Sequence, residues 1–349
     1  MTAGLRRWLR YAIAVAAHHG GLDFVYRKAT GAGLVVLMLH RLRDAHDPYP
    51  LSLSRASFRQ LTGWLGERRA LVDLESGLRA LSDARDSRVH YAITFDDGYR
   101  DNLGLLEADE MGGIHAPVPA VVYVATGHVG GETIWAYRLQ HAVLARSQDH
   151  LDLSSLGLGS FDLSQPIERN RLYEQLPPRL KQFPPREVEA HVDGIAAQLQ
   201  PNPASTRGDM LDWPDIRTLD AGGIRIGAHT RHHVLLSRVD AMAARDEIAG
   251  SRADIDRATG IAPAHFAYPN GGAGDFGERD VRMVREAGYA TAVTSIEGIN
   301  RRDVDPYRIR RHNVFEERYR APSGRLSKAL FFSETSGLLG WLQARRAAA

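Results

Sequence analysis

Val89-His-Tyr-Ala-Ile-Thr-Phe-Asp-Asp-Gly98 is the stretch that decides the fold of this chain. A β-rich run, typical of a buried strand, ends at two carboxylates and a glycine that permits a tight turn. Similar runs predict further strands at residues 33–40, 118–125, 224–228, 265–268, 290–294 and 308–314. Helical patterns separate them, so we expect right-handed βα units. About seven such strands predict an α/β protein with a distorted (β/α) barrel.

One long stretch, from about residue 130 to 210, departs from this alternation. Apolar residues recur at helical spacing over 135–143 and 188–199, and proline pairs at 177–178 and 184–185 punctuate the stretch. We therefore expect a helical insertion between two βα units. The expected organisation is an N-terminal helical segment (1–32), the barrel with its insertion (33–320) and a C-terminal helical tail (321–349).

The composition excludes several classes of function. Lys plus Arg number 44 against 42 Asp plus Glu, a net charge of +2, which argues against a nucleic-acid-binding protein. The hydrophobic fraction of 44% is ordinary for a globular protein with a real core. The sequence has no cysteine, which removes disulfides, thiol nucleophiles and zinc–thiolate sites together.

The N-terminus allows three interpretations. Arg6, Arg7 and Arg10 precede the short apolar run Tyr11–Ala17. An amphipathic helix in a cytoplasmic protein is the first, and a basic helix in peripheral contact with an anionic membrane is the second. The third is a signal peptide, which would direct the protein to the periplasm or outside the cell.

Residues that suit a metal ion follow two of the predicted strands. Asp96 and Asp97 end one strand, and His229-Thr-Arg-His-His233 directly follows another. Two imidazoles four positions apart can converge on one ion, and imidazole plus carboxylate suits catalytic zinc. The carboxyl ends of barrel strands form a single face. We therefore predict that Asp97, His229 and His233 hold zinc or another divalent ion, with His232 structural.

Two more strand ends add chemistry to the same face. Phe266-Ala-Tyr-Pro-Asn-Gly271 combines Pro and Gly in a tight turn that can aim a backbone N–H at a developing oxyanion. Leu37-Met-Leu-His40 ends the first strand. In a closed barrel the first strand lies beside the last, so His40 is expected on the face that carries Asp96 and Asp97.

Taken together and in this order, the motifs Thr94–Gly98, His229–His233 and Phe266–Gly271 resemble those of the polysaccharide deacetylases with a NodB-homology domain, carbohydrate esterase family four. The resemblance extends over about residues 33–315. It implies that Asp96 is the catalytic base and that the three predicted ligands bind the metal.

The resemblance also implies supporting roles for other residues. The backbone N–H of Asn270, together with the metal, would stabilise the oxyanion, and Tyr268 and Trp213 would contact the substrate. Two departures from the family pattern stand out. Ala267 occupies the position where the family usually has an arginine that orients the base, and the family's late Leu-x-x-His motif is missing near the C-terminus.

The missing late motif has a counterpart at the start of the chain. Leu37-Met-Leu-His40 has the same pattern, which resembles the circularly permuted branch of the family known from exopolysaccharide deacetylases. His40 then inherits the role of general acid, with His312 as the alternative. The implied activity is the removal of N-acetyl groups from amino sugars of a glycan, releasing acetate. An O-acetyl esterase and a catalytically impaired carbohydrate-binding homologue are the alternatives.

Overall fold

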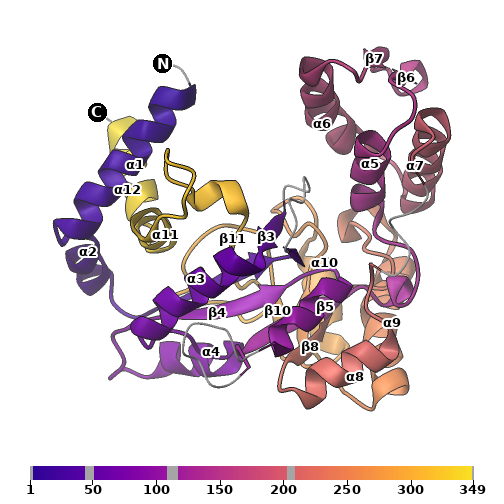
Figure 1. Cartoon of the computed structure of the whole chain (residues 1–349). Coiled ribbons are helices and arrows are strands. Elements are labelled where there is room, and N and C mark those ends of the chain that lie inside the picture. Colours follow the sequence, from indigo (N-terminus) through magenta and orange to yellow (C-terminus); the bar gives the residue numbers. More distant parts are fainter. Residues whose placement is uncertain (1–2, 44–50, 108–116, 203–208, 348–349) are drawn as a thin grey trace.

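Seven parallel strands form the centre of the molecule, curled into a nearly closed barrel in a computed structural model (Figure 1). The structure describes residues 3–43, 51–107, 117–202 and 209–347. The strands are β1 (Gly33–Leu39), β4 (Val89–Phe95), β5 (Ala120–Val124), β8 (Arg225–Ala228), β9 (His265–Ala267), β10 (Thr291–Val293) and β11 (Arg311–Asn313). Their order, β10-β9-β8-β5-β4-β1-β11, places the first strand beside the last.

The segment before β11 brings the two edges of the sheet together. The amide of Ile309 donates to the carbonyl of Ala292 at 3.0 Å, and the amide of Thr294 donates back to Ile309 at 2.8 Å. This pairing links β10 to the chain that runs into β11. The predicted α/β barrel of about seven strands is confirmed.

Alternate residues of each strand face the barrel interior. The apolar part of this interior consists of Leu34, Val36, Ala92, Val121, Tyr123, Ala267, Val293 and Ile309. Leu74 and Leu81 of α4 (Leu74–Ser82) join the same cluster. The opposite faces of the strands pack against α3 (Arg55–Glu67), α8 (Trp213–Ala221), α9 (Ala241–Thr259) and α10 (Glu278–Glu286). Because side chains alternate between the two faces of a strand, every second residue reaches the interior.

The helical insertion is present and has a core of its own. It comprises α5 (Trp135–Leu144), the antiparallel pair β6 (His150–Asp152) and β7 (Ser160–Asp162), α6 (Pro166–Leu180) and α7 (Pro185–Leu199). Leu139, Leu176 and Val192 are among its buried residues. In Figure 1 these elements stand as a lobe above one side of the barrel. Pro185 begins α7, as the pattern predicted, but Pro177 and Pro178 lie inside the last turn of α6.

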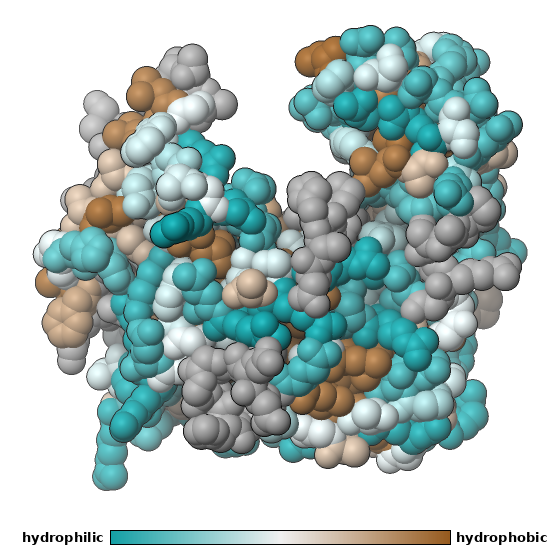
Figure 2. Space-filling view, in the orientation of Figure 1, coloured by the Kyte–Doolittle hydropathy of each residue, from teal (hydrophilic) through white to brown (hydrophobic). Residues whose placement is uncertain are grey.

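The two ends of the chain lie together on the other side of the barrel (Figure 1). Here α1 (Ala3–His19) and α2 (Leu22–Thr30) meet α11 (Lys328–Thr335) and α12 (Leu338–Ala347). Ala14 is buried against Leu330 and Leu339, and Arg10 pairs with Glu334 at 2.5 Å. Figure 2 shows a hollow between this region and the insertion lobe. None of the described helices is long and apolar enough to cross a membrane.

Short elements complete the chain. The parallel pair β2 (Arg41–Arg43) and β3 (Ser52–Ser54) lies outside the barrel sheet. Single 3-10 turns or short 3-10 helices occur at Arg100–Leu106, Thr126–His128, Ser154–Leu156, Leu236–Arg238 and Glu316–Tyr319.

Candidate active site

The three predicted metal ligands converge at the carboxyl ends of β4 and β8. The Nε2 atoms of His229 and His233 each lie 3.4 Å from Oδ1 of Asp97. One ligand atom from each residue lies within 4.8 Å of the others. Asp97 and His229 are buried, and His233 is nearly so. The structure thus brings together the residues that the strand-end argument selected.

The hydrogen bonds of this cluster suit a divalent cation. Nδ1 of His229 donates to the carbonyl of Ala267 at 2.8 Å, which leaves Nε2 with its lone pair toward Asp97. Oδ1 of Asp97 and Nδ1 of His233 are buried, and neither has a hydrogen-bond partner among the described residues. One carboxylate and two imidazoles form the donor set of many catalytic zinc sites. The residues present therefore fit a zinc ion.

Electrostatics at the cluster also favour a positive ion. Burial opposes ionisation of Asp97, but the neighbouring imidazoles of His229 and His233 outweigh it and lower the pKa of the carboxyl group. Burial lowers the pKa of His233 to about 3, so this imidazole is neutral and able to act as a ligand. Asp97 is thus an ionised ligand beside a neutral one.

The backbone at the ligands is strained. Asp97 has φ of 77°, Thr230 has 61° and His233 has 52°, all in the left-handed region that non-glycine residues avoid. Such conformations cost of order 1–3 kcal/mol each and persist where the surroundings enforce them, often at functional sites. Gly98 continues the turn at φ of 82°, where a Cβ would lie 3.3 Å from the Val124 side chain.

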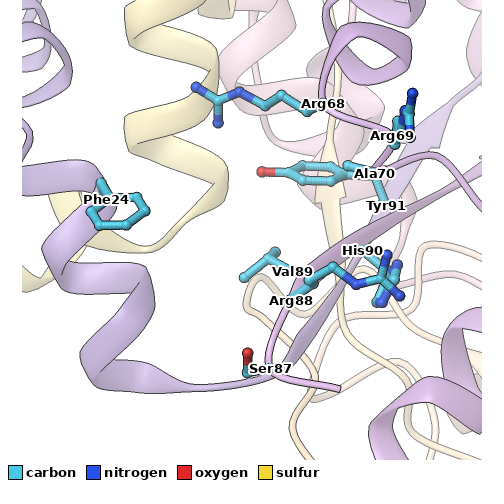
Figure 3. A pocket seen from close by; sticks show the side chains of 9 residues that line it. All are labelled: Phe24, Arg68, Arg69, Ala70, Ser87, Arg88, Val89, His90 and Tyr91. Carbon is cyan, nitrogen blue, oxygen red and sulfur yellow. The ribbon is translucent and has the colours of Figure 1, made fainter. Parts of the chain in front are cut away.

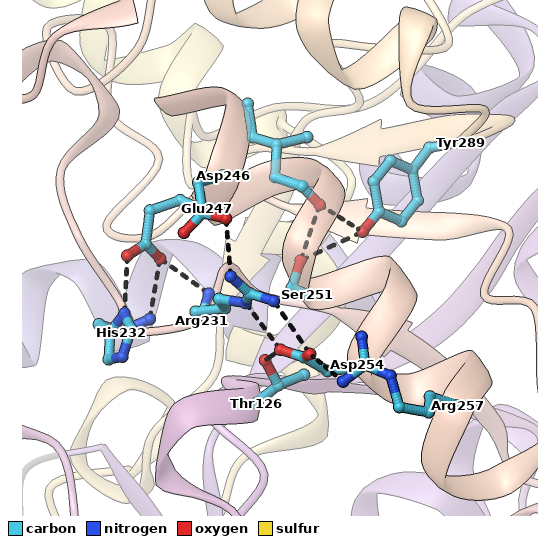
Figure 4. A network of polar contacts seen from close by, with 10 residues as sticks. Thr126, Arg231, His232, Asp246, Glu247, Ser251, Asp254, Arg257 and Tyr289 are labelled. Carbon is cyan, nitrogen blue, oxygen red and sulfur yellow. Dashed lines mark hydrogen bonds and ion pairs between the residues drawn. The ribbon is translucent and has the colours of Figure 1, made fainter. Parts of the chain in front are cut away.

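Helix α9 holds the loop His229–His233, here called the histidine loop, in this conformation, as Figure 4 shows. Oε2 of Glu247 accepts the backbone N–H groups of Arg231 and His232 at 2.8 and 2.9 Å, and its Oε1 contacts Nδ1 of His232 at 2.7 Å. The guanidinium of Arg231 donates to Asp254 and Asp246. His232 therefore holds the loop to α9, in line with its expected structural role.

The expected base, Asp96, is paired with an arginine that the sequence did not single out. Both terminal nitrogens of Arg311 donate to the carboxylate of Asp96, each at 2.7 Å, and Nε donates to the carbonyl of Thr294 at 2.7 Å. Both side chains are buried. Burial opposes ionisation of Asp96, but the charge of Arg311 outweighs it and lowers the pKa of this carboxyl group.

Arg311 thus provides from β11 the support that Ala267 lacks. The guanidinium lies in the barrel interior, where Ala267 is fully buried. The available signal was the alternation along the last strand, because Ile309 and Arg311 share one side. An arginine on an interior position needs a carboxylate partner there, and Asp96 is that partner.

His40 lies on the interior side at the end of β1, in register with the site. It is buried, with no partner for Nδ1 among the described residues, and its carbonyl accepts a bond from Asn102 Nδ2 at 3.0 Å. Burial lowers the pKa of His40, and the nearby charges of Asp97 and Asp96 oppose that effect. Asp97, Asp96 and His229 are thus among the groups whose charges act on His40.

The chain directly after His40 is held by a buried cation. Nε of Arg41 donates to Asp101 at 2.8 Å, and the guanidinium lies 4.4 Å from the ring centres of both Tyr99 and Tyr137. Tyr137 belongs to α5, so this stack links the insertion lobe to the strand that carries His40.

His312, the alternative acid, faces the other way. Arg311 points into the interior, and the next residue of a strand points outward. Nδ1 of His312 lies 3.2 Å from Glu297, which also pairs with Arg318. The geometry favours His40 over His312.

The structure separates the remaining predicted residues. Tyr268 is buried in the outer core, stacked on Phe276 at 4.0 Å, and its hydroxyl donates to the carbonyl of Tyr307. These contacts bury its side chain, and its expected contact with the substrate stays a prediction. Asn270, at φ of 56°, lines a cleft together with His233. Trp213 begins α8, half-buried against the outer core, and its substrate contact stays a prediction.

A second cavity lies at the other end of the barrel, next to α2. Figure 3 shows its lining side chains, with Phe24 on one side and Arg68, Tyr91 and His90 on the other. It adjoins the amino end of β4, starting at Val89. Barrel enzymes carry their catalytic groups at the carboxyl ends, so we do not assign catalysis to this cavity.

Comparison with known proteins agrees with this geometry. Residues 184–292 match the family model for polysaccharide deacetylases. The resemblance to the polysaccharide deacetylases is confirmed. Within this deacetylase match lie His229, His233 and Asn270, whereas Asp96 and Arg311 lie outside it. No curated protein matches the chain.

Solved structures of deacetylases share the fold. The deacetylase PplD of Streptococcus pyogenes, solved with acetate, is 15% identical with a TM-score of 0.51, over 82% of this chain and 95% of its own. A polysaccharide deacetylase of Bacillus cereus is 15% identical with a TM-score of 0.52, over 87% and 69%. IcaB of Ammonifex degensii is 17% identical with a TM-score of 0.50, over 88% and 97%. At these identities the likeness is one of fold.

Proposed function

We propose that this protein is a metal-dependent hydrolase that removes N-acetyl groups from amino sugars of a polysaccharide. The observation that carries the proposal is the ionised, arginine-held carboxylate of Asp96 directly beside the Asp97, His229 and His233 cluster. The match of residues 184–292 to the polysaccharide deacetylases supports the same activity. A base and a Lewis-acid site side by side are what the hydrolysis of an amide requires.

Each residue has one step in the proposed reaction. A divalent ion in the cluster supplies Lewis acidity toward the acetyl carbonyl and makes water more acidic. Asp96 accepts the proton of the attacking water as its oxygen bonds to the acetyl carbon. The backbone N–H of Asn270 donates to the oxyanion. His40, in its protonated form, gives its proton to the sugar nitrogen as the carbon–nitrogen bond breaks, leaving acetate and a free amine.

The impaired-homologue alternative rested on Ala267, the position that lacks the orienting arginine. Arg311 removes that reason, because the base has a bidentate partner from another strand. The esterase alternative uses the same residues, so substrates must decide between the two activities.

The deciding experiment measures acetate release by the purified, zinc-supplemented protein. We expect release from chitin oligosaccharides and none from the Asp97→Ala variant, while acetylated xylan is a poorer substrate. Faster release from xylan would establish the esterase instead. No release from either glycan, in a folded protein with bound metal, would leave only the binding homologue.

We also propose a membrane-peripheral location. Leu5 and Trp8 of α1 and Phe24 and Val25 of α2 are exposed. Brown apolar atoms over this part of the molecule are visible in Figure 2. Helix α1 has three arginines and no carboxylate. Arg10 pairs with Glu334 and Arg7 lies 3.8 Å from Glu317, and the part of this charge that is not neutralised suits anionic lipid headgroups. Its packing on α11 supports a helix that belongs to the fold over a removed signal segment.

Vesicle sedimentation tests this location. We expect the protein to sediment with phosphatidylglycerol vesicles and to remain in solution with phosphatidylcholine vesicles. The Leu5→Ser/Trp8→Ser variant should lose most of this binding. Met242→Ser is the matched control, because Met242 is exposed on α9. Equal loss in the control, or no binding by the parent protein, would refute the proposal.

A further inference from the structure

The backbone that carries the proposed general acid, His40, is tied to the segment that follows the proposed base. The side-chain amide of Asn102 donates to the carbonyl of His40 at 3.0 Å, and the amide of Leu42 donates to Oδ1 of Asp101 at 3.0 Å. Asn102 and Asp101 both lie on the 3-10 helix Arg100–Leu106, which follows the turn at the end of β4. These contacts hold the acid in place relative to the base.

Arg41, the residue after His40, adds a side chain to this connection. Its Nε donates to Oδ2 of Asp101 at 2.8 Å, and each of its terminal nitrogens lies 3.3 Å from a carboxylate oxygen of Asp209. Only 1% of the Arg41 side chain is exposed. Because a planar guanidinium binds both carboxylates at once, it fixes their separation as well as the course of the chain at His40.

The two ends of the insertion lobe meet at Arg41. Tyr137 belongs to α5, the first helix of the lobe, and its ring centre lies 4.4 Å from the guanidinium carbon. The hydroxyl of Tyr137 also accepts a hydrogen bond from Arg43 at 2.9 Å. Asp209 belongs to the chain that returns from the lobe, where its carbonyl accepts the amide of Arg100 at 2.8 Å. A shift of the lobe against the barrel therefore moves the partners of Arg41.

We infer that the insertion lobe positions the general acid of the proposed reaction, through the contacts of Tyr137 and Asp209 with Arg41. The inference rests on the proposed function, and it makes Arg41 and Tyr137 positioning residues. A misplacement of about 1 Å in a reacting group can slow a reaction roughly 10²-fold, so a displaced His40 protonates the sugar nitrogen poorly. The lobe then affects the chemical step without supplying a catalytic residue.

Two substrates distinguish this role from a purely structural one. The amine leaves only with a proton from His40, whereas the phenolate of an aryl acetate leaves without one. A variant that displaces His40 therefore loses amide hydrolysis selectively, while damage to the base, the metal site or the fold lowers both activities. The measured quantity is the ratio of kcat/KM for a chitin oligosaccharide to kcat/KM for an aryl acetate, here called the amide-to-ester ratio.

Tyr137→Leu is the first variant, because it removes the aromatic face and the hydroxyl but keeps an apolar side chain on α5. We expect the amide-to-ester ratio to fall about tenfold, since Arg41 loses one of its two stacked rings. Arg41→Lys keeps the charge but cannot bind both carboxylates, and should lower the ratio by roughly 10²-fold. Circular dichroism and zinc content show that each variant is folded.

Tyr173→Leu is the matched control, because Tyr173 lies on α6 and packs against the core of the same lobe. It should leave the amide-to-ester ratio unchanged. If Arg41→Lys does not fold, Tyr137→Leu decides alone. A ratio in Tyr137→Leu equal to that of the control, or a parallel loss of both activities, would overturn the inference. A parent protein that hydrolyses no amide would instead refute the proposed function, so the two failures are distinguishable.

Discussion

Arg311 and Asp96 form a bidentate ion pair in the barrel interior, with both N–O distances 2.7 Å, although 215 positions of sequence separate them. Neither side chain exposes more than 4% of its surface. The pair fixes both carboxylate oxygens of the proposed base in one plane. Through this pair, β11, the last strand of the barrel, contributes to a site whose carboxylates follow β4.

We predict that Arg311→Lys lowers kcat by about 10²-fold with little change in KM, because a single ammonium cannot hold both oxygens of Asp96 in place. Arg311→Met, which leaves a buried carboxylate unpaired, should also lower the free energy of unfolding by about 3–5 kcal/mol. Steady-state kinetics and urea denaturation measure the two effects.

A rescue experiment distinguishes a positioning role of Arg311 from a purely structural one. Ala267→Arg combined with Arg311→Ala puts a guanidinium where related deacetylases are expected to have theirs. Recovery of at least part of kcat in this double variant supports the positioning role. Full activity in Arg311→Lys alone would refute it.

Asp96→Asn should slow acetate release by roughly 10²-fold or more, because an amide cannot accept the proton of the attacking water. Zinc content should be unchanged, since Asp96 contacts Arg311 and not the histidines. Elemental analysis beside kinetics makes both measurements. Turnover close to that of the parent protein would mean that Asp96 serves only the fold.

The protein purified under mild conditions should contain about one divalent ion per chain, most readily zinc. Its removal by a chelator should lower the melting temperature as well as the activity, because the ion binds only the folded cluster. His229→Ala should abolish metal binding, whereas His232→Ala should retain it. A protein that is metal-free and fails to bind added zinc, cobalt or nickel contradicts this prediction.

His40→Ala should nearly abolish amide hydrolysis and retain a larger fraction of activity on an aryl acetate, because an amine needs a proton to leave and a phenolate does not. His312→Ala should affect both substrates only slightly. The comparison uses an N-acetylated oligosaccharide and an aryl acetate. Loss of amide hydrolysis in His312→Ala alone would overturn the permuted assignment.

Glu247→Gln should weaken zinc binding by roughly 10–100-fold, because the carboxylate that holds the histidine loop loses its charge and one acceptor. Competition with a chelating dye measures the affinity without any turnover. Glu286→Gln is the control, since Glu286 makes a similar ion pair, with Arg245, at the surface. Equal affinities in the two variants would show that the loop needs no support from Glu247.

The long strands β1, β4 and β5 could be predicted because parallel strands buried on both faces appear as mostly apolar runs. The shorter strands, such as the polar β11, were recognisable chiefly by their alternation with helical patterns. The pairs β2–β3 and β6–β7 could not be predicted, because these three-residue strands lie outside the alternation of barrel strands and helices. Pro177 and Pro178 were expected to mark a turn outside the helices. They lie instead inside the last turn of α6, and the helix ends two residues later at Leu180.

The metal ligands could be predicted because their positions directly after strands place them on one face. Which of two neighbouring residues faces inward could not. Arg310 directly precedes β11 and Arg311 begins it, and the register that pairs Arg311 with Val36 of β1 selects Arg311 for the interior. The same uncertainty explains Tyr268, whose neighbour Ala267 takes the interior side.

The placement of β11 beside β1 has a consequence for the order in which the protein is made. A ribosome that has completed residue 300 has already produced Asp96, His40 and the three proposed metal ligands. The base still lacks its arginine, because Arg311 has not been synthesised. The barrel closes only when β11 has left the ribosome and paired with β1, and only then does Asp96 gain its arginine partner.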